Sequence, residues 1–221
     1  AFPLLTKILF PEVNALQYAF LGPLVGAGAR VAAGKACDRF GGGRITFWTF
    51  IAMSDAIRAP RLWDYVTRAG GTSIVLSVPG TYPPRPLNGV MVGCFLTPSI
   101  ESRYTYPAKL RDEIEEVVGE YLFDAKDFRT EDKAYLLRQV YEMTDRRFRL
   151  AEHLLETKPW TLFAMVEMGP DRMHHGFWKF MDPEHRKHEP GNPYESAILD
   201  YHRHLDGLIA RLLEHADEDT V

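Results

Sequence analysis

The sequence has few cysteines and little net charge, and both shortages exclude common classes of protein. Its two cysteines, Cys37 and Cys94, stand far apart and match no metal-binding or redox spacing, which argues against a disulfide framework. A net charge of −4 over 221 residues provides no basic surface for nucleic acid. The chain also lacks internal repeats and the features of a secretory signal peptide. We therefore expect a cytoplasmic protein without a nucleic-acid partner.

What is present is the composition of an ordinary globular protein, with 46% hydrophobic and 25% charged residues. That average hides a change near residue 53. Residues 1–53 hold five basic and two acidic side chains, a net charge of +3, and the rest of the chain carries −7. Within the first part, residues 13–29 include no charged side chain and are rich in glycine and alanine, as packed membrane helices are. We therefore predict that residues 1–53 and 54–221 do not share a core.

A second apolar run, residues 45–53, ends where Ser54 and Asp55 begin. As a helix it would cover roughly half of a ~30 Å hydrocarbon core. The first part therefore predicts one complete membrane-type helix and half of another, and residues 1–53 are expected to associate with a membrane.

The segment GKACDRFGGGR resembles the loop signature between consecutive membrane helices of the major facilitator superfamily, and its surroundings are similar to nitrate/nitrite transporters of that superfamily. The residues in register with the signature are Gly34, Asp38, Arg39, Gly41 and Arg44. Arg30 falls where these transporters carry an arginine that binds the anion. Transport by this fragment is not expected, because Arg30 would lack the surrounding helices that satisfy a charge in lipid.

From Ser54 onward the pattern is typical of a soluble α/β protein. We expect strands over residues 73–78, 89–96 and 161–168, and helices from Pro60 to Gly70, over 109–121, from Thr130 to about Glu156, and from Asn192 to Leu212. The many acidic side chains of 109–121 indicate a solvated helix face.

The stretch around residues 161–168 holds the candidate site. This short apolar run lies between Lys158-Pro159 and Gly169-Pro170, which predicts a strand buried on both faces of a parallel sheet. Asp171 follows the end of that strand, where ligands bind in open α/β sheets. If a helix begins near Pro170, Asp171 and His175 lie one turn apart on the same face. A carboxylate and an imidazole placed in this way can hold zinc or manganese.

The same spacing has a second interpretation. Asp171 in the first turn of a helix is favoured by the helix dipole, and His174 and His175 would then be ordinary surface residues. Two ligands are also fewer than the three or four that zinc takes from proteins. The spacing alone leaves both interpretations open.

Four blocks of residues 54–221 together resemble the alkaline phosphatase superfamily, in particular its type I phosphodiesterase/nucleotide pyrophosphatase-like branch. The blocks are IRAPRLWDYVTRAG, SVPGTYPPRPLNGVMVGCFLTPS, MGPDRMHHGFWKFMDPEH and NPYESAILDYHRHLDGLI. The resemblance implies a mostly parallel sheet flanked by helices, two divalent metal ions (zinc or manganese), a Thr or Ser nucleophile and a small phosphoester substrate. It also implies that Asp171 and His175 are two ligands of one metal, with His174 a neighbour outside the motif.

The chain departs from that family pattern at both ends. The first metal-binding Asp and the nucleophile belong where the transporter-like segment stands, and the Asp-His-Gly motif and the last His belong after Val221. Thr81, Thr97 and Ser99 are interpreted as loop hydroxyls, so no catalytic residue is assigned. We therefore expect at most a partial metal site and a phosphoester hydrolase that is catalytically incomplete. The alternatives are a nitrate/nitrite transporter fragment and a non-catalytic fusion or truncation product.

Overall fold

The computed structural model describes residue 34, residues 38–39, residue 41 and residues 59–220. The membrane-type helices predicted within residues 1–53 lie outside the described residues. By its internal contacts the chain divides into two compact units, Ala1–Ile57 and Arg58–Val221. In the part that the structure describes, no helix is both long enough and apolar enough to cross a membrane.

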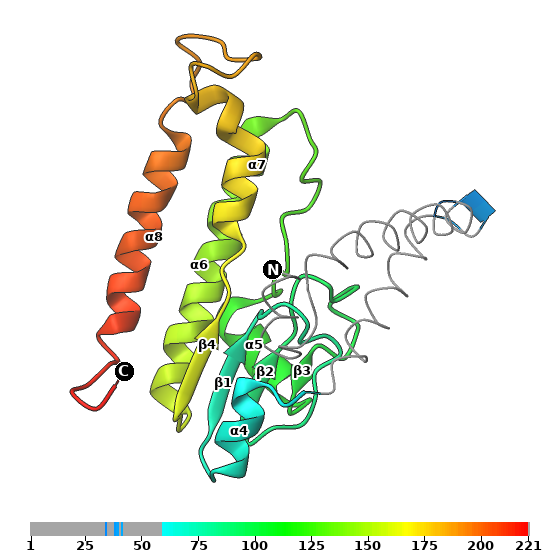
Figure 1. The fold of residues 1–221 in the computed structure, drawn as a ribbon, viewed down its shortest axis with the longest axis vertical. Coiled ribbons are helices and arrows are strands. Elements are labelled where there is room, and N and C mark those ends of the chain that lie inside the picture. Colours follow the sequence, from blue (N-terminus) through cyan, green and yellow to red (C-terminus); the bar gives the residue numbers. More distant parts are fainter. Residues whose placement is uncertain (1–33, 35–37, 40, 42–58, 221) are drawn as a thin grey trace, which may run out of the picture. The chain divides into compact units, whose positions relative to one another are not determined.

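The second unit is an α/β structure built on a mixed, open sheet of four strands (Figure 1). The strands are β1 (Ser73–Leu76), β2 (Gly89–Val92), β3 (Thr105–Tyr106) and β4 (Leu162–Met165), in the order β3-β2-β1-β4. β1 pairs in parallel with both β2 and β4, whereas β2 and β3 are antiparallel. The prediction of an α/β sheet flanked by helices is confirmed, and the antiparallel β3 makes the sheet mixed.

β1 is an interior strand and β4 lies at an edge of the described sheet, which corrects the prediction that residues 161–168 form a strand buried on both faces. All four residues of β1 are fully buried, because β2 and β4 pair with it on either side and helices cover both of its faces. β4 is shorter than predicted and only half-buried, since β1 is its one strand partner among the described residues. The order of strands in a sheet depends on tertiary packing, and an apolar run alone does not reveal it.

Five described helices accompany the sheet. They are α4 (Leu62–Arg68), α5 (Leu110–Val118), α6 (Lys133–Thr157), α7 (Gly169–Met181) and α8 (Ala197–Leu213). Four of them start later than predicted, and the difference is largest for α6 and α8. α6 is capped by Asp132 instead of Thr130, because the Asp132 carboxylate accepts the N–H of Tyr135 at 2.9 Å. α8 also starts later, because the side chain of Asn192 accepts the N–H of Tyr194 at 2.9 Å and forms a turn there.

The helices cover both faces of the sheet. Trp63 of α4 packs with Val75 and Met91 on one face. On the other face, α5 and α6 pack against β1 and β2 around Ile114 and Leu154. The acidic side of α5 is not wholly solvated as predicted: the Glu113 carboxylate lies 2.8 Å from His153 Nε2 and 2.7 Å from Lys158 Nζ.

A second apolar cluster joins α6, α7 and α8, and Figure 1 shows α8 running alongside α6. Val140 of α6, Phe177 of α7 and Tyr201 of α8 are all fully buried in it. Because α6 contributes to both clusters, it fixes α7 relative to the sheet. The first turn of α7 is thereby held just beyond the carboxyl end of β4.

Candidate metal site at the carboxyl ends of the strands

The start of α7 is a tightly packed junction. The helix begins at Gly169 with Pro170 in its first turn, as predicted from the sequence. A Cβ atom on Gly169 would lie 1.8 Å from Tyr201 Oη and 2.8 Å from Thr144 Oγ1. Only glycine therefore fits between α7, α6 and α8 at this position, and this packing fixes where the first turn of α7 lies.

Asp171 and His175 converge on the exposed side of that first turn. His175 Nε2 lies 3.5 Å from Asp171 Oδ1, and the side chains are 67% and 49% exposed. The prediction that these two side chains meet just beyond the strand is confirmed. Their role as metal ligands stays a prediction. The donor set, one carboxylate oxygen and one imidazole nitrogen that solvent can reach, fits zinc or manganese.

The described residues contain no group of three or more His, Cys, Asp or Glu side chains that could together hold a metal ion. His174 turns away from the pair, and its ring stacks on that of His202 with centroids 5.5 Å apart. Asp171 and His175 are thus the two candidate ligands in the described part of the chain.

Arg172, which the sequence did not single out, binds the other oxygen of Asp171. Arg172 Nη1 donates to Asp171 Oδ2 at 2.7 Å, and its Nε donates to Asp124 Oδ1 at 2.6 Å. Its guanidinium carbon also lies 4.7 Å from the centroid of the Phe128 ring. The hydrogen bonds to Asp124, together with the charges of Asp124 and Asp171, raise the pKa of Arg172 above its ordinary value. Arg172 is therefore a permanently charged partner of the candidate ligand.

A cavity of about 300 Å³ opens beside Asp171 and Arg172. Ser77, which follows β1, and Val166, which follows β4, line it, so it lies at the carboxyl ends of the parallel strands. Ser77 has a φ of 55°, a left-handed conformation that is uncommon for residues other than glycine, and its Oγ lies 2.7 Å from Tyr121 Oη. The cavity thus combines the candidate ligand with cationic and hydroxyl groups.

The three hydroxyls interpreted as loop residues take no part in this cavity. Thr81 Oγ1 donates to the carbonyl of Val78 at 2.7 Å, and Ser99 Oγ lies 3.5 Å from Ser102 Oγ. Thr97 Oγ1 is buried without a hydrogen-bond partner among the described residues. The hydroxyl that does line the cavity is that of Ser77. Its place directly after the apolar run of β1 was a signal in the sequence that it lies at the carboxyl end of a strand.

Beneath the cavity lies a buried ion pair between Arg147 and Glu167. Arg147 is 1% exposed; its Nη1 lies 3.2 Å from Glu167 Oε2 and its Nε donates to Tyr121 Oη at 3.3 Å. Burial alone would lower the pKa of Arg147, but Tyr121 and Glu167 outweigh it and raise the pKa above its ordinary value. Glu167 Oε1 accepts the N–H of Gly169 at 2.7 Å. The ion pair therefore ties α6 directly to the start of α7.

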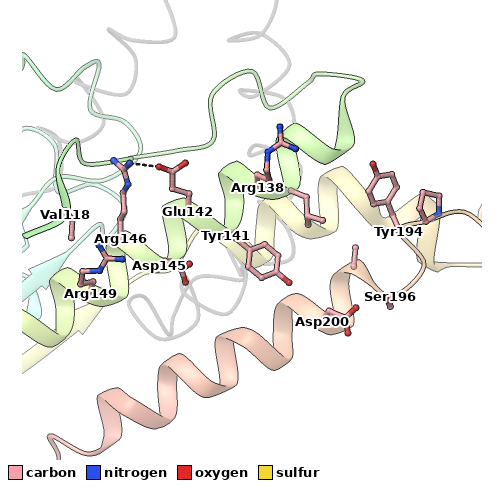
Figure 2. Close-up of a pocket in the computed structure, with 13 residues that line it drawn as sticks. Val118, Arg138, Tyr141, Glu142, Asp145, Arg146, Arg149, Tyr194, Ser196 and Asp200 are labelled. Atoms are coloured by element: carbon pink, nitrogen blue, oxygen red, sulfur yellow. Dashed lines mark hydrogen bonds and ion pairs between the residues drawn. The ribbon is translucent and has the colours of Figure 1, made fainter.

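A larger groove of about 750 Å³ lies elsewhere, along α6 and the start of α8 (Figure 2). Its charged side chains are three arginines and three carboxylates, namely Arg138, Arg146, Arg149, Glu142, Asp145 and Asp200. Arg146 forms an ion pair with Glu142, as Figure 2 shows, and Asp145 Oδ1 lies 2.6 Å from His204 Nε2. The opposite charges balance, and neither Asp171 nor His175 lines this groove, so it is separate from the candidate metal site.

The fold and the site together define an open α/β protein with a polar cavity at the carboxyl ends of its parallel strands. The profile of one family, described as "Type I phosphodiesterase / nucleotide pyrophosphatase", matches residues 35–221. The chain belongs to this family. The match begins before residue 54 and so includes part of the transporter-like segment. No solved structure matches the chain significantly.

Among curated proteins, the chain is similar to nitrate/nitrite transporters over partial segments. It is 53% identical over 53 residues to the nitrate/nitrite transporter NarU of Salmonella typhimurium, which covers 24% of this chain and 12% of the transporter. It is 37% identical over 105 residues to NarU of Escherichia coli, and this match covers 48% of this chain and 20% of that transporter. It is 30% identical over 113 residues to the probable nitrate/nitrite antiporter NarK2 of Thermus thermophilus, and this match covers 41% of this chain and 26% of that antiporter. The chain thus spans at most about a quarter of these relatives, and both resemblances are confirmed.

Proposed function

We propose that the chain is part of a metal-dependent phosphoester hydrolase and that Asp171 and His175 supply two ligands to one divalent ion, zinc or manganese. The observation that carries the proposal is the convergence of the two exposed side chains, 3.5 Å apart, at the carboxyl end of the sheet. Membership of the phosphodiesterase family supports the same chemistry. When bound, such an ion acts as a Lewis acid that polarises a phosphoryl oxygen.

The surroundings of the pair suit a small phosphoester once a metal ion is bound. Arg147 and Arg172 both line the cavity next to Asp171, but each is already paired with a carboxylate, so the positive charge that attracts the anion would come from the metal ion. Phe95 and Phe123 line its apolar part. At about 300 Å³ the cavity has the size of the smaller ligand pockets of proteins. We therefore propose a small phosphodiester or pyrophosphate as the substrate class.

This chain by itself is proposed to be catalytically incomplete. Two ligands leave a metal site short of the three protein ligands that catalytic zinc sites use, and among the described residues no hydroxyl beside Asp171 is paired with a general base. Ser77 Oγ, the hydroxyl in the cavity, is within hydrogen-bonding distance of another hydroxyl, that of Tyr121. The residues assigned here thus bind and orient a phosphoester without supplying the attacking group.

The test is the hydrolysis of a chromogenic phosphodiester by the purified chain in the presence of Zn²⁺ or Mn²⁺. We expect little or no turnover above the rate of the metal ion alone, and the same result for Asp171→Asn. Metal-dependent turnover that disappears in Asp171→Asn and persists in the exposed-surface control Asp200→Asn would contradict the proposed incompleteness. It would also show that a nucleophile is present.

A further inference from the structure

We infer that Arg172 is a positioning residue that fixes the orientation of Asp171, so that one carboxylate oxygen faces His175 and stays open to a metal ion. This inference rests on the proposed function, because it concerns the same pair of ligands. It assigns the three residues that surround the pair, Arg172, Asp124 and Phe128, to the metal site.

The guanidinium of Arg172 bridges two carboxylates. Its Nε and Nη2 both donate to Asp124, one to each carboxylate oxygen, and its Nη1 donates to Asp171 Oδ2 at 2.7 Å. A planar guanidinium that binds one carboxylate through two N–H groups has its plane fixed by that contact. Asp124 therefore determines where the third N–H group, the one that binds Asp171, is placed.

An aromatic ring from the same loop as Asp124 supports this arrangement. The Phe128 ring lies under the Arg172 guanidinium at 4.7 Å, and the His175 ring meets it edge-on with centroids 6.2 Å apart. The Arg172 side chain is only 15% exposed, whereas the Asp171 side chain is 49% exposed. The positioning group is thus shielded by protein while the oxygen that it leaves free faces solvent.

The consequence for Asp171 is a defined rotamer. With Oδ2 held by Arg172, Oδ1 points to His175 Nε2 at 3.5 Å. An ion bound between Oδ1 and Nε2 would then meet two ligands that are already oriented. Hydrogen bonds to a ligating carboxylate contribute to metal affinity in this way, and their loss typically weakens binding by about 10- to 100-fold.

The charge balance is also compatible with a cation. One guanidinium shared by Asp124 and Asp171 leaves one negative charge on the three side chains, so a divalent ion is still attracted. If Arg172 instead acted as a competing cation, its removal would strengthen metal binding. The two roles therefore predict opposite signs for the same substitution.

The experiment is a Zn²⁺ titration of the full chain, followed by the NMR signals of the His175 imidazole. We expect Arg172→Met to bind Zn²⁺ about 10- to 100-fold more weakly than the unsubstituted chain. Arg172→Lys should show an intermediate affinity, because an ammonium keeps the charge but cannot bind both carboxylates through a planar fork. Asp124→Asn, which leaves Asp171 intact, should weaken binding in the same direction.

The matched control is Arg203→Met, which removes an exposed arginine that pairs with Asp200 at 3.2 Å on α8. Its Zn²⁺ affinity should be unchanged. The backbone amide spectrum of each variant shows whether it is folded. Arg172→Lys keeps the test decisive if Arg172→Met does not fold: it retains the positive charge, so it should bind Zn²⁺ as well as the unsubstituted chain if Arg172 acts only as a competing cation.

Two results would overturn the inference in distinguishable ways. If the unsubstituted chain binds Zn²⁺ at His175, and Arg172→Met and Asp124→Asn bind it equally well or more tightly, Arg172 does not position Asp171 and the proposed function stands. If Zn²⁺ leaves the His175 signals unchanged in the unsubstituted chain, or if Asp171→Asn binds as well as that chain, the metal pair itself is wrong. In that case the inference fails together with the proposed function.

Discussion

Replacing Arg147 with methionine should lower the free energy of unfolding by about 3–5 kcal/mol. Methionine fills much of the space of the arginine stem but leaves Glu167, whose side chain is 9% exposed, as a buried carboxylate without its ion-pair partner. The carbonyls of Leu122 and Phe123 would also lose the N–H groups of Arg147 that they accept. Urea unfolding at neutral pH, followed by circular dichroism, measures the change.

The neighbouring residue offers a matched control for this prediction. Arg146 pairs with Glu142 on the partly exposed side of the same helix, and Arg146→Met should cost less than about 1 kcal/mol. Adding Glu167→Gln to Arg147→Met should recover part of the loss, because it removes the unpaired charge. A loss below about 1 kcal/mol for Arg147→Met would mean that the ion pair does not hold α7 in place.

Substituting alanine for Gly169 should lower the free energy of unfolding by about 1–3 kcal/mol, the usual cost of overpacking a filled core. The new Cβ would lie 1.8 Å from Tyr201 Oη, and Tyr201 is fully buried, so its ring cannot move aside. The resulting shift of α7 would also displace Asp171. Thermal unfolding of the purified variant measures the loss of stability.

Two further variants separate this clash from a general effect of alanine. Gly207→Ala on α8 meets no atom within 4 Å and should be neutral or stabilising by up to about 1 kcal/mol. Tyr201→Phe removes the closest of the atoms that the new Cβ would meet, but Tyr201 Cζ at 2.6 Å and Thr144 Oγ1 at 2.8 Å remain, so it should restore only part of the stability of Gly169→Ala. If Gly169→Ala is as stable as the unsubstituted chain, the junction is looser than its geometry indicates.

Local sequence patterns were sufficient for most elements of the second unit. The apolar runs and their flanking breakers gave β1, β2 and β4, and the Gly169-Pro170 pair gave the start of α7 and with it the convergence of Asp171 and His175. β3 was missed because two residues are too few to show a strand period. The edge position of β4 was missed because chain order does not specify strand order.

The contacts that hold the site could not be predicted from the sequence in the same way. Arg172 and Asp124 are 48 residues apart, and Arg147 and Glu167 are 20 apart, so both pairs form only once the helices pack. One signal was present: Glu167 interrupts the apolar run 161–168, and a carboxylate in such a position requires a buried partner. The identity of that partner depends on the packing of α6, which local spacing does not report.

The central claim is that Asp171 and His175 together bind a divalent ion. Anomalous diffraction at the zinc absorption edge, from crystals of the chain grown with Zn²⁺, tests it most directly. We expect an anomalous peak about 2 Å from both Asp171 Oδ1 and His175 Nε2. An anomalous map with zinc bound at other residues and none between these two atoms would show that Asp171 and His175 are not the ligands.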